Sequence, residues 1–190
     1  MNTPAHLLVN LALLGRRESP RHQLYILTGA LLPDAPMFLF YFIEKILRNI
    51  PEHVIWSHDY YLEAWQNFFD CFNSLPFIIV GVLIAWKAHS QAGLFLGISM
   101  GFHVFADLPL HHDDGHRHFF PVSDWRFESP ISYWDPQHYG HIVTGLEVVV
   151  VLVSALSVLR GTSSYLTKWF VGIVAISYFA FFGYALWVWV

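Results

Sequence analysis

Histidine and aspartate side chains gather in one stretch of the chain, GFHVFADLPLHHDDGHRHFF, at residues 101–120. Within this stretch, His103 and Asp107 stand four positions apart in an apolar run. In a helix, the i, i+4 spacing puts both side chains on one face. An imidazole and a carboxylate placed in this way suit two ligands of one metal ion, or one ligand and its orienting carboxylate. The alternative is a hydrogen bond between helices that needs no ion.

The composition of the chain is that of a membrane protein. Of its 190 residues, 55% are hydrophobic, 18% are aromatic and only 13% are charged, and the mean hydropathy is +0.45. The charged fraction is near half of the usual share, which favours a membrane protein over a soluble one. The formal net charge of −4 gives no indication of a nucleic-acid partner. The single cysteine, Cys71, has no second cysteine in the chain to pair with.

Apolar segments follow one another along the chain, and they predict helices because backbone amides in lipid must be satisfied within the segment. Five are long enough to cross a bilayer. They are residues 22–43, 64–86, 91–108, 140–159 and 166–190. A shorter apolar segment, 4–14, comes first, and its positive charges follow it, unlike those of a secretory signal. We expect an all-α integral membrane protein, a bundle of about five transmembrane helices plus a short N-terminal helix, forming a single domain over residues 1–190.

The links between these segments differ in charge and predict an orientation. Lys and Arg residues concentrate in three links that fall on one side of the membrane if the segments alternate. They are Arg16, Arg17, Arg21, Lys87, Arg160 and Lys168. The positive-inside rule places that side in the cytoplasm. The long loop 109–139, rich in histidine, aspartate and aromatic residues, is therefore expected on the outer, periplasmic side.

Ionisable residues inside the spans are expected to meet at one depth. At 1.5 Å per residue, Asp34 and His103 both lie about 20 Å above the inner surface. Asp70 and Glu147 enter from the outer side and reach about 10 Å inward, and His6 lies near the outer end of its short helix. Such residues are costly in lipid and are functional candidates by default. Taken singly, Asp70 or Glu147 would serve equally well as a structural acceptor between helices, but a structural set has no reason to share one depth.

The outer loop offers further ligands of the same type. His111 and His112 directly follow a span, and His141 begins the next one, so we expect one of these three to complete a metal site. A solvated polar turn around the HHDDGHRH tract would look similar. Imidazole and carboxylate without thiolate suit a divalent metal, with zinc expected first and manganese or iron(II) as alternatives. The aromatic segments of the loop are expected to fold back over the mouth of the site.

Three short motifs resemble those of a known family: PAHL at residues 4–7, GALLPD at 29–34 and HVFAD at 103–107. They are similar to the membrane-bound metal-dependent hydrolases of bacterial inner membranes, which are related in motif to zinc-dependent phospholipase C and its related nucleases. A subgroup with LHHDDG and FESPVSYWD-like segments carries cobalamin-biosynthesis names. The resemblance implies an integral membrane fold with a metal site. Its ligands would be His6, Asp34, His103 and Asp107.

One position departs from the family pattern. Family members carry RGxTHS at the start of the third span, where this chain reads DCFNSLPF. The histidine of that motif is missing here. Either Asp70 substitutes for it as a ligand, or the site holds fewer ions, or hydrolysis is lost.

These observations lead to a first hypothesis and two alternatives. The first is a metal-dependent hydrolase that acts at the outer face on a lipid-like ester or phosphodiester, with Asp70 or Glu147 as general base. Membrane lipids and a small-molecule or lipid substrate would be its partners. The second is a non-catalytic protein that binds or moves metal ions or protons. The third is a structural or assembly subunit whose metal site only locks the helices together.

Overall fold

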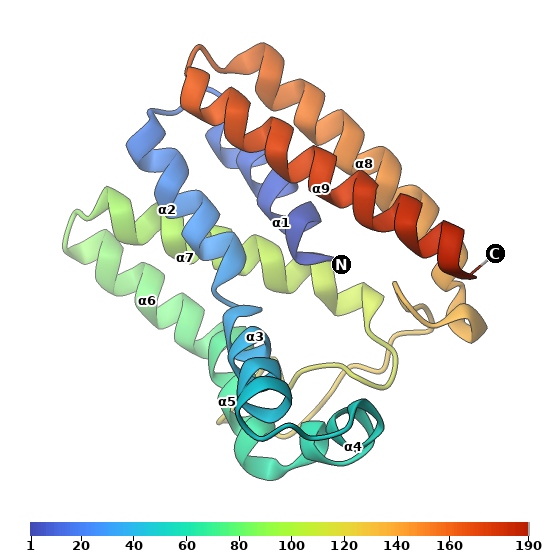
Figure 1. The fold of residues 1–190 in the computed structure, drawn as a ribbon. Coiled ribbons are helices and arrows are strands. Elements are labelled where there is room, and N and C mark those ends of the chain that lie inside the picture. The colour runs from blue at the N-terminus through green and yellow to red at the C-terminus, as the bar shows by residue number, and fades with distance from the viewer. Residues whose placement is uncertain (190) are drawn as a thin grey trace.

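A computed structural model describes the backbone of residues 1–189 and the side chains up to residue 183. Every regular element in this range is a helix (Figure 1). The helices are α1 (Thr3–Asn10), α2 (Pro20–Leu31), α3 (Ala35–Tyr41), α4 (Glu52–Ser57), α5 (Glu63–Asn73), α6 (Leu75–Lys87), α7 (Gln91–Asp107), α8 (Gly140–Gly161) and α9 (Tyr165–Trp189). Helical turns extend α1 through Gly15 and α3 through Leu47. The all-helical architecture predicted from the sequence is confirmed.

Several of these helices are apolar and long enough to cross a membrane. Four qualify alone, at Glu63–Lys87, Gln91–Leu110, Gly140–Gly161 and Tyr165–Gly183. A fifth candidate is the pair Pro20–Leu31 and Ala35–Leu47, whose axes are bent by 56° at a short break. These candidates correspond to the five segments predicted from the sequence.

Proline and serine residues explain where several helices begin. Ser19, Ser74 and Ser90 each accept a hydrogen bond from a backbone N–H in the first turn of α2, α6 and α7, which is the usual role of an N-cap serine. Ser74 interrupts the segment predicted as one helix over 64–86 and divides it into α5 and α6. The break arises because Ser74 adopts an extended backbone and Pro76 has no N–H for the helix before it.

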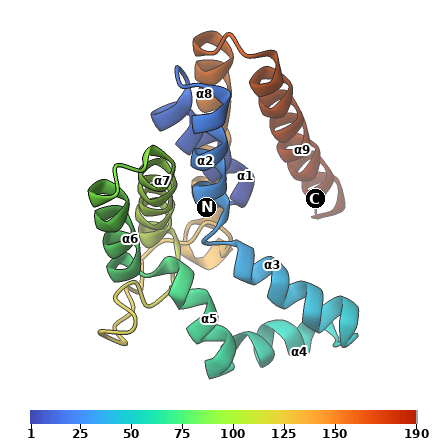
Figure 2. The same ribbon diagram turned by 90° about the vertical axis from the view of Figure 1, so that its left-hand side faces the viewer.

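The short links lie at one end of the bundle and the long loop at the other (Figure 2). The α1–α2 link lies against the C-terminal part of α8, since the guanidinium of Arg16 donates to Ser157 Oγ at 3.4 Å. Helix α1 packs between α2, α7, α8 and α9. One apolar core joins α1 to α8 and α9 through Leu8, Val151 and Tyr178, among others.

A second core holds α3, α4 and α5 together as an arm that leaves the main bundle (Figure 2). It is built from aromatic rings, with Phe40 against Trp65 at 5.1 Å and against Phe69 at 5.5 Å between centroids. The arm and the main bundle meet where α2 ends and α3 begins. That junction holds Asp34.

Candidate metal centre

Three buried side chains from two helices form the centre of the candidate site. His6 comes from α1, and His103 and Asp107 come from α7; their exposed fractions are 0%, 0% and 4%. One donor atom from each lies within 4.8 Å of the other two, so the three are able to hold one ion. His6 Nε2 is 2.9 Å from Asp107 Oδ1, and His103 Nε2 is 3.1 Å from Asp107 Oδ2. The structure therefore brings together a histidine from the N-terminal motif and the HVFAD pair.

The backbone of α2 fixes the orientation of His103. Its Nδ1 lies 2.7 Å from the carbonyl oxygen of Ala30. A carbonyl only accepts, so Nδ1 carries the proton and Nε2 of the neutral ring has a free lone pair. A ligand histidine in a metal site commonly donates its other N–H to a carbonyl or carboxylate in this way. The close contact of α2 with α7 depends on Gly29, where a Cβ atom would lie 2.2 Å from the carbonyl oxygen of Leu96.

Two nitrogen atoms of this group have no hydrogen-bond partner. His6 Nδ1 and His103 Nε2 are both buried without one. His103 Nε2 nevertheless lies 3.1 Å from Asp107 and 3.4 Å from Asp34 Oδ1. In tetrahedral zinc sites with bonds of 2.0–2.1 Å, neighbouring ligand atoms are about 3.3 Å apart. The donor set and its spacing therefore fit a divalent ion, and a buried unpaired imidazole nitrogen would otherwise cost stability.

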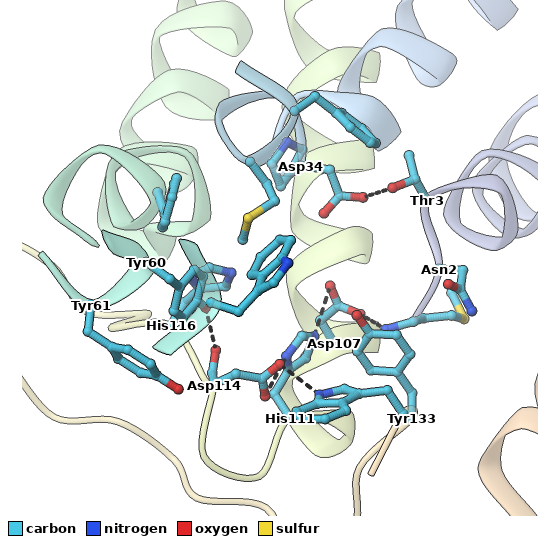
Figure 3. A pocket seen from close by; sticks show the side chains of 17 residues that line it. Asn2, Thr3, Asp34, Tyr60, Tyr61, Asp107, His111, Asp114, His116 and Tyr133 are labelled. Carbon is cyan, nitrogen blue, oxygen red and sulfur yellow. Dashed lines mark hydrogen bonds and ion pairs between the residues drawn. The ribbon is translucent and has the colours of Figure 1, made fainter. Parts of the chain in front are cut away.

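Asp34 lies beside this group at the break between α2 and α3. Its carboxylate accepts a hydrogen bond from the hydroxyl of Thr3. Its side chain is 25% exposed, far more than those of His103 and Asp107. Asp34 lines a cavity (Figure 3). It is thus the carboxylate of the group that is most open to a substrate.

The cavity has a volume of about 460 Å³ and separates the main bundle from the arm. Asp34, Asp107, His111, Asp114 and His116 form its polar side (Figure 3). Aromatic rings from the arm and the outer loop supply the rest of the wall. They are Phe38, Trp56, Tyr60, Tyr61, Phe69, Tyr133 and Trp134. The SYWDP segment of the loop therefore borders the cavity, as a lid would, whereas the FFPVSDW segment contributes no lining residue.

His111 reaches the centre from the outer loop. Its Nε2 is 3.7 Å from Asp107 Oδ2, and its Nδ1 is 3.0 Å from Asp114 Oδ1. Burial would lower the pKa of His111, but the two carboxylates outweigh burial and raise this pKa to about 9. The pKa of Asp114 is lowered, because the nearby imidazole of His111 outweighs burial. Asp107 and Asp114 together therefore make this position favourable for positive charge.

Asp70 lies outside the cavity lining and anchors the outer loop to α5. Its carboxylate, fully buried, accepts hydrogen bonds from the side chain and the backbone N–H of Arg117. Arg126 Nη2 lies 3.7 Å from the same carboxylate, and His116 Nδ1 lies 3.4 Å from it. Asp70 is therefore held by the loop arginines Arg117 and Arg126 and is not aimed at the His6–His103–Asp107 group.

Glu147 on α8 holds the start of the chain. It accepts hydrogen bonds from the backbone N–H and the side-chain amide of Asn2, at 3.2 and 2.8 Å. A third comes from the hydroxyl of Tyr178 on α9, at 2.8 Å. Glu147 does not line the cavity. It helps to place Thr3 and His6, and so acts on the centre through α1.

The other loop histidines predicted as ligands lie elsewhere. His112 Nδ1 is 2.6 Å from the carbonyl oxygen of Ser129, and its ring stacks on His138 at 3.6 Å between centroids. His141 is exposed on α8. Neither lines the cavity. Of the three candidates, only His111 is brought to the centre.

Two cavity residues, Asp114 and His116, were not among the residues predicted for the site. Both belong to HHDDGHRH, whose composition suits a solvated turn as well as a metal tract. Comparisons of the chain with protein-family models, curated proteins and solved structures give no match. The resemblance to membrane-bound metal-dependent hydrolases therefore stays an expectation based on three short motifs.

Proposed function

We propose that this protein is a membrane-embedded metal-dependent hydrolase that cleaves a lipid-like ester or phosphodiester. The observation that carries the proposal is the unpaired, buried Nε2 of His103, held 3.1 Å from Asp107 and 3.4 Å from Asp34 at the edge of a cavity. Three protein ligands with an open position are typical of catalytic rather than structural zinc sites. His6, His103 and Asp107 supply those three.

In this proposal, the ion would lower the pKa of a bound water and polarise the scissile group as a Lewis acid. Zinc suits the imidazole and carboxylate ligands, and manganese or iron(II) are alternatives. Asp34 would accept the proton, since it is the most exposed carboxylate of the group and lines the cavity. We assign the base role to Asp34 rather than to Asp70 or Glu147, whose oxygens are engaged by Arg117 and by Asn2 and Tyr178.

The cavity supports a substrate with an apolar part. About 460 Å³ is within the usual range for a small-molecule site. Aromatic side chains make up seven of its seventeen lining residues. Phe38 and Trp56 on this wall are 54% and 45% exposed and so offer apolar surface to an acyl chain.

We further propose that the chain crosses a bacterial inner membrane with the loop 109–139 on the periplasmic side. The apolar helices and the Lys and Arg residues of the short links support this orientation. In a Cys71→Ser background, an impermeant thiol reagent should label Val122→Cys in intact spheroplasts. It should label Ala88→Cys, in the α6–α7 link, only after lysis. The reverse pattern would refute the orientation.

Hydrolysis is tested with purified protein in detergent or liposomes. We expect turnover of short-chain phospholipids or acyl esters that disappears after chelation and returns with zinc, manganese or iron(II). Bound metal without turnover on any ester or phosphodiester would refute the hydrolase and favour a structural metal site. Uptake of divalent ions into liposomes would instead favour ion transport.

A further inference from the structure

A second group of unpaired polar atoms lies in the same cavity, outside the His6–His103–Asp107 centre. His111 Nδ1, Asp114 Oδ1 and His116 Nδ1 are all buried without a hydrogen-bond partner. They account for three of the six such side-chain atoms among the described residues. Buried polar groups are nearly always paired, so a cluster of orphans on one cavity wall requires an explanation. A bound cation is the simplest one, because two imidazoles and a carboxylate are metal ligands.

His111 and Asp114 are spaced like two ligands of one ion, whereas His116 lies farther away. His111 Nδ1 and Asp114 Oδ1 are 3.0 Å apart, yet they form no hydrogen bond. The rings of His111 and His116 have centroids 6.1 Å apart. Two imidazoles on one tetrahedral ion have centroids about 5 Å apart. The His116 ring must therefore move toward His111 for the three side chains to share one ion.

Neighbouring side chains contact two of these residues in the way that hydrogen-bonding partners orient metal ligands. Trp134 Nε1 donates to the other oxygen of Asp114 at 3.0 Å, which leaves Oδ1 free. Asp70 Oδ1 lies 3.4 Å from His116 Nδ1 and is placed to orient this ring, so the ligand atom of His116 would be Nε2. Orienting partners of this kind are common behind metal ligands. They also give Asp70 a role in the site that does not require it to touch substrate.

The second group is adjacent to the first through Asp107. Asp107 Oδ2 faces His103 Nε2 at 3.1 Å on one side and His111 Nε2 at 3.7 Å on the other. Figure 3 shows Asp107, His111 and Asp114 in succession along the cavity wall. A pair of ions at such neighbouring positions is a recurrent arrangement in hydrolytic enzymes.

We propose that His111, Asp114 and His116 form a second divalent-metal site of the outer loop, next to the centre on α1 and α7. The site depends on loop residues alone, so it stands whether or not the first centre hydrolyses a substrate. This second site would give the histidine-rich tract HHDDGHRH a metal-binding function in addition to bordering the cavity.

The test is metal stoichiometry in detergent-purified full-length protein that is stripped and then titrated with zinc. We expect two equivalents in the unmodified protein. Asp114→Asn and His116→Gln should each reduce the bound zinc to one equivalent. His103→Ala should remove zinc from the first centre, while binding of zinc to the outer loop stays detectable. His141→Ala, which changes an exposed histidine near the loop, is the control and should still bind two equivalents of zinc. A single equivalent in the unmodified protein, or two equivalents in both loop variants, would overturn the proposal.

A spectroscopic measurement covers the case in which a variant fails to fold. In unmodified protein loaded with manganese(II), two ions at adjacent positions should give an exchange-coupled electron paramagnetic resonance signal at two equivalents. An isolated-ion spectrum at saturation would overturn the second site without bearing on turnover. Conversely, a coupled pair with no hydrolysis would uphold the second site and refute the proposed function.

Discussion

The imidazole rings of His6 and His103 stack face to face, with centroids 3.6 Å apart and planes 12° from parallel. The two residues come from α1 and α7, which are far apart in the sequence. In this stack, His6 Nε2 faces Oδ1 of Asp107 and His103 Nε2 faces Oδ2. The centre is therefore an inter-helical arrangement, and substitutions should separate its metal-binding role from its structural one.

Replacing His103 should remove the ion from the first centre. His103→Ala leaves only His6 and Asp107 of the three donors, so we expect the affinity for the first zinc equivalent to fall by more than about 100-fold, beyond the effect of losing a supporting contact. Metal analysis after equilibrium dialysis measures this loss. His53→Ala, at an exposed position on α4, serves as the control. Full retention of the first equivalent by His103→Ala would contradict the assignment.

Replacing Asp34 should separate metal binding from turnover. Asp34→Asn keeps the size of the side chain and its contact with Thr3 but cannot accept the proton. We expect the first zinc equivalent to remain and kcat to fall by about 10²–10⁴-fold. Asp113→Asn removes an exposed carboxylate of the outer loop and should change neither zinc binding nor kcat. Loss of the ion together with activity would show instead that Asp34 is a ligand.

Replacing Asp70 should affect folding before it affects chemistry. Asp70→Asn leaves Arg117 without its buried carboxylate, and breaking a buried ion pair costs about 3–5 kcal/mol. We expect a clearly lower Tm in thermal unfolding followed by circular dichroism in detergent. Glu63→Gln, at an exposed position on the same helix, is the matched control. An unchanged Tm would contradict the role of Asp70 as an anchor of the outer loop.

Adding one methyl group at Gly29 should disturb the centre from a distance. The new Cβ of Gly29→Ala would meet the carbonyl of Leu96 at 2.2 Å and force α2 away from α7. We expect a loss of about 1–3 kcal/mol of stability and weaker zinc binding, since Ala30 would move from His103. Gly81→Ala has nothing within 4 Å of its Cβ and should be neutral or stabilising by up to about 1 kcal/mol. Equal changes in stability and zinc affinity for Gly29→Ala and Gly81→Ala would contradict a role of the α2–α7 contact in the metal centre.

The sequence by itself determined the helical elements and one part of the centre. Apolar segments of spanning length specify helices locally, because each must satisfy its own backbone hydrogen bonds. The spacing of His103 and Asp107 on one helix face is likewise a local property, and it holds in α7. The break at Pro33 and Pro36, which exposes Asp34, follows from proline stereochemistry.

Only the tertiary structure decided which polar residues meet. A shared depth does not specify the direction that each helix face takes, so the sequence placed Asp70 and Glu147 in the same site as Asp34. Packing separated them: Gly29 lets α2 approach α7, and this contact orients His103 through Ala30. The loop is fixed by Arg117 on Asp70, which turns His111 inward, whereas His112 turns to Ser129. These contacts join residues distant in the chain, so no local pattern encodes them.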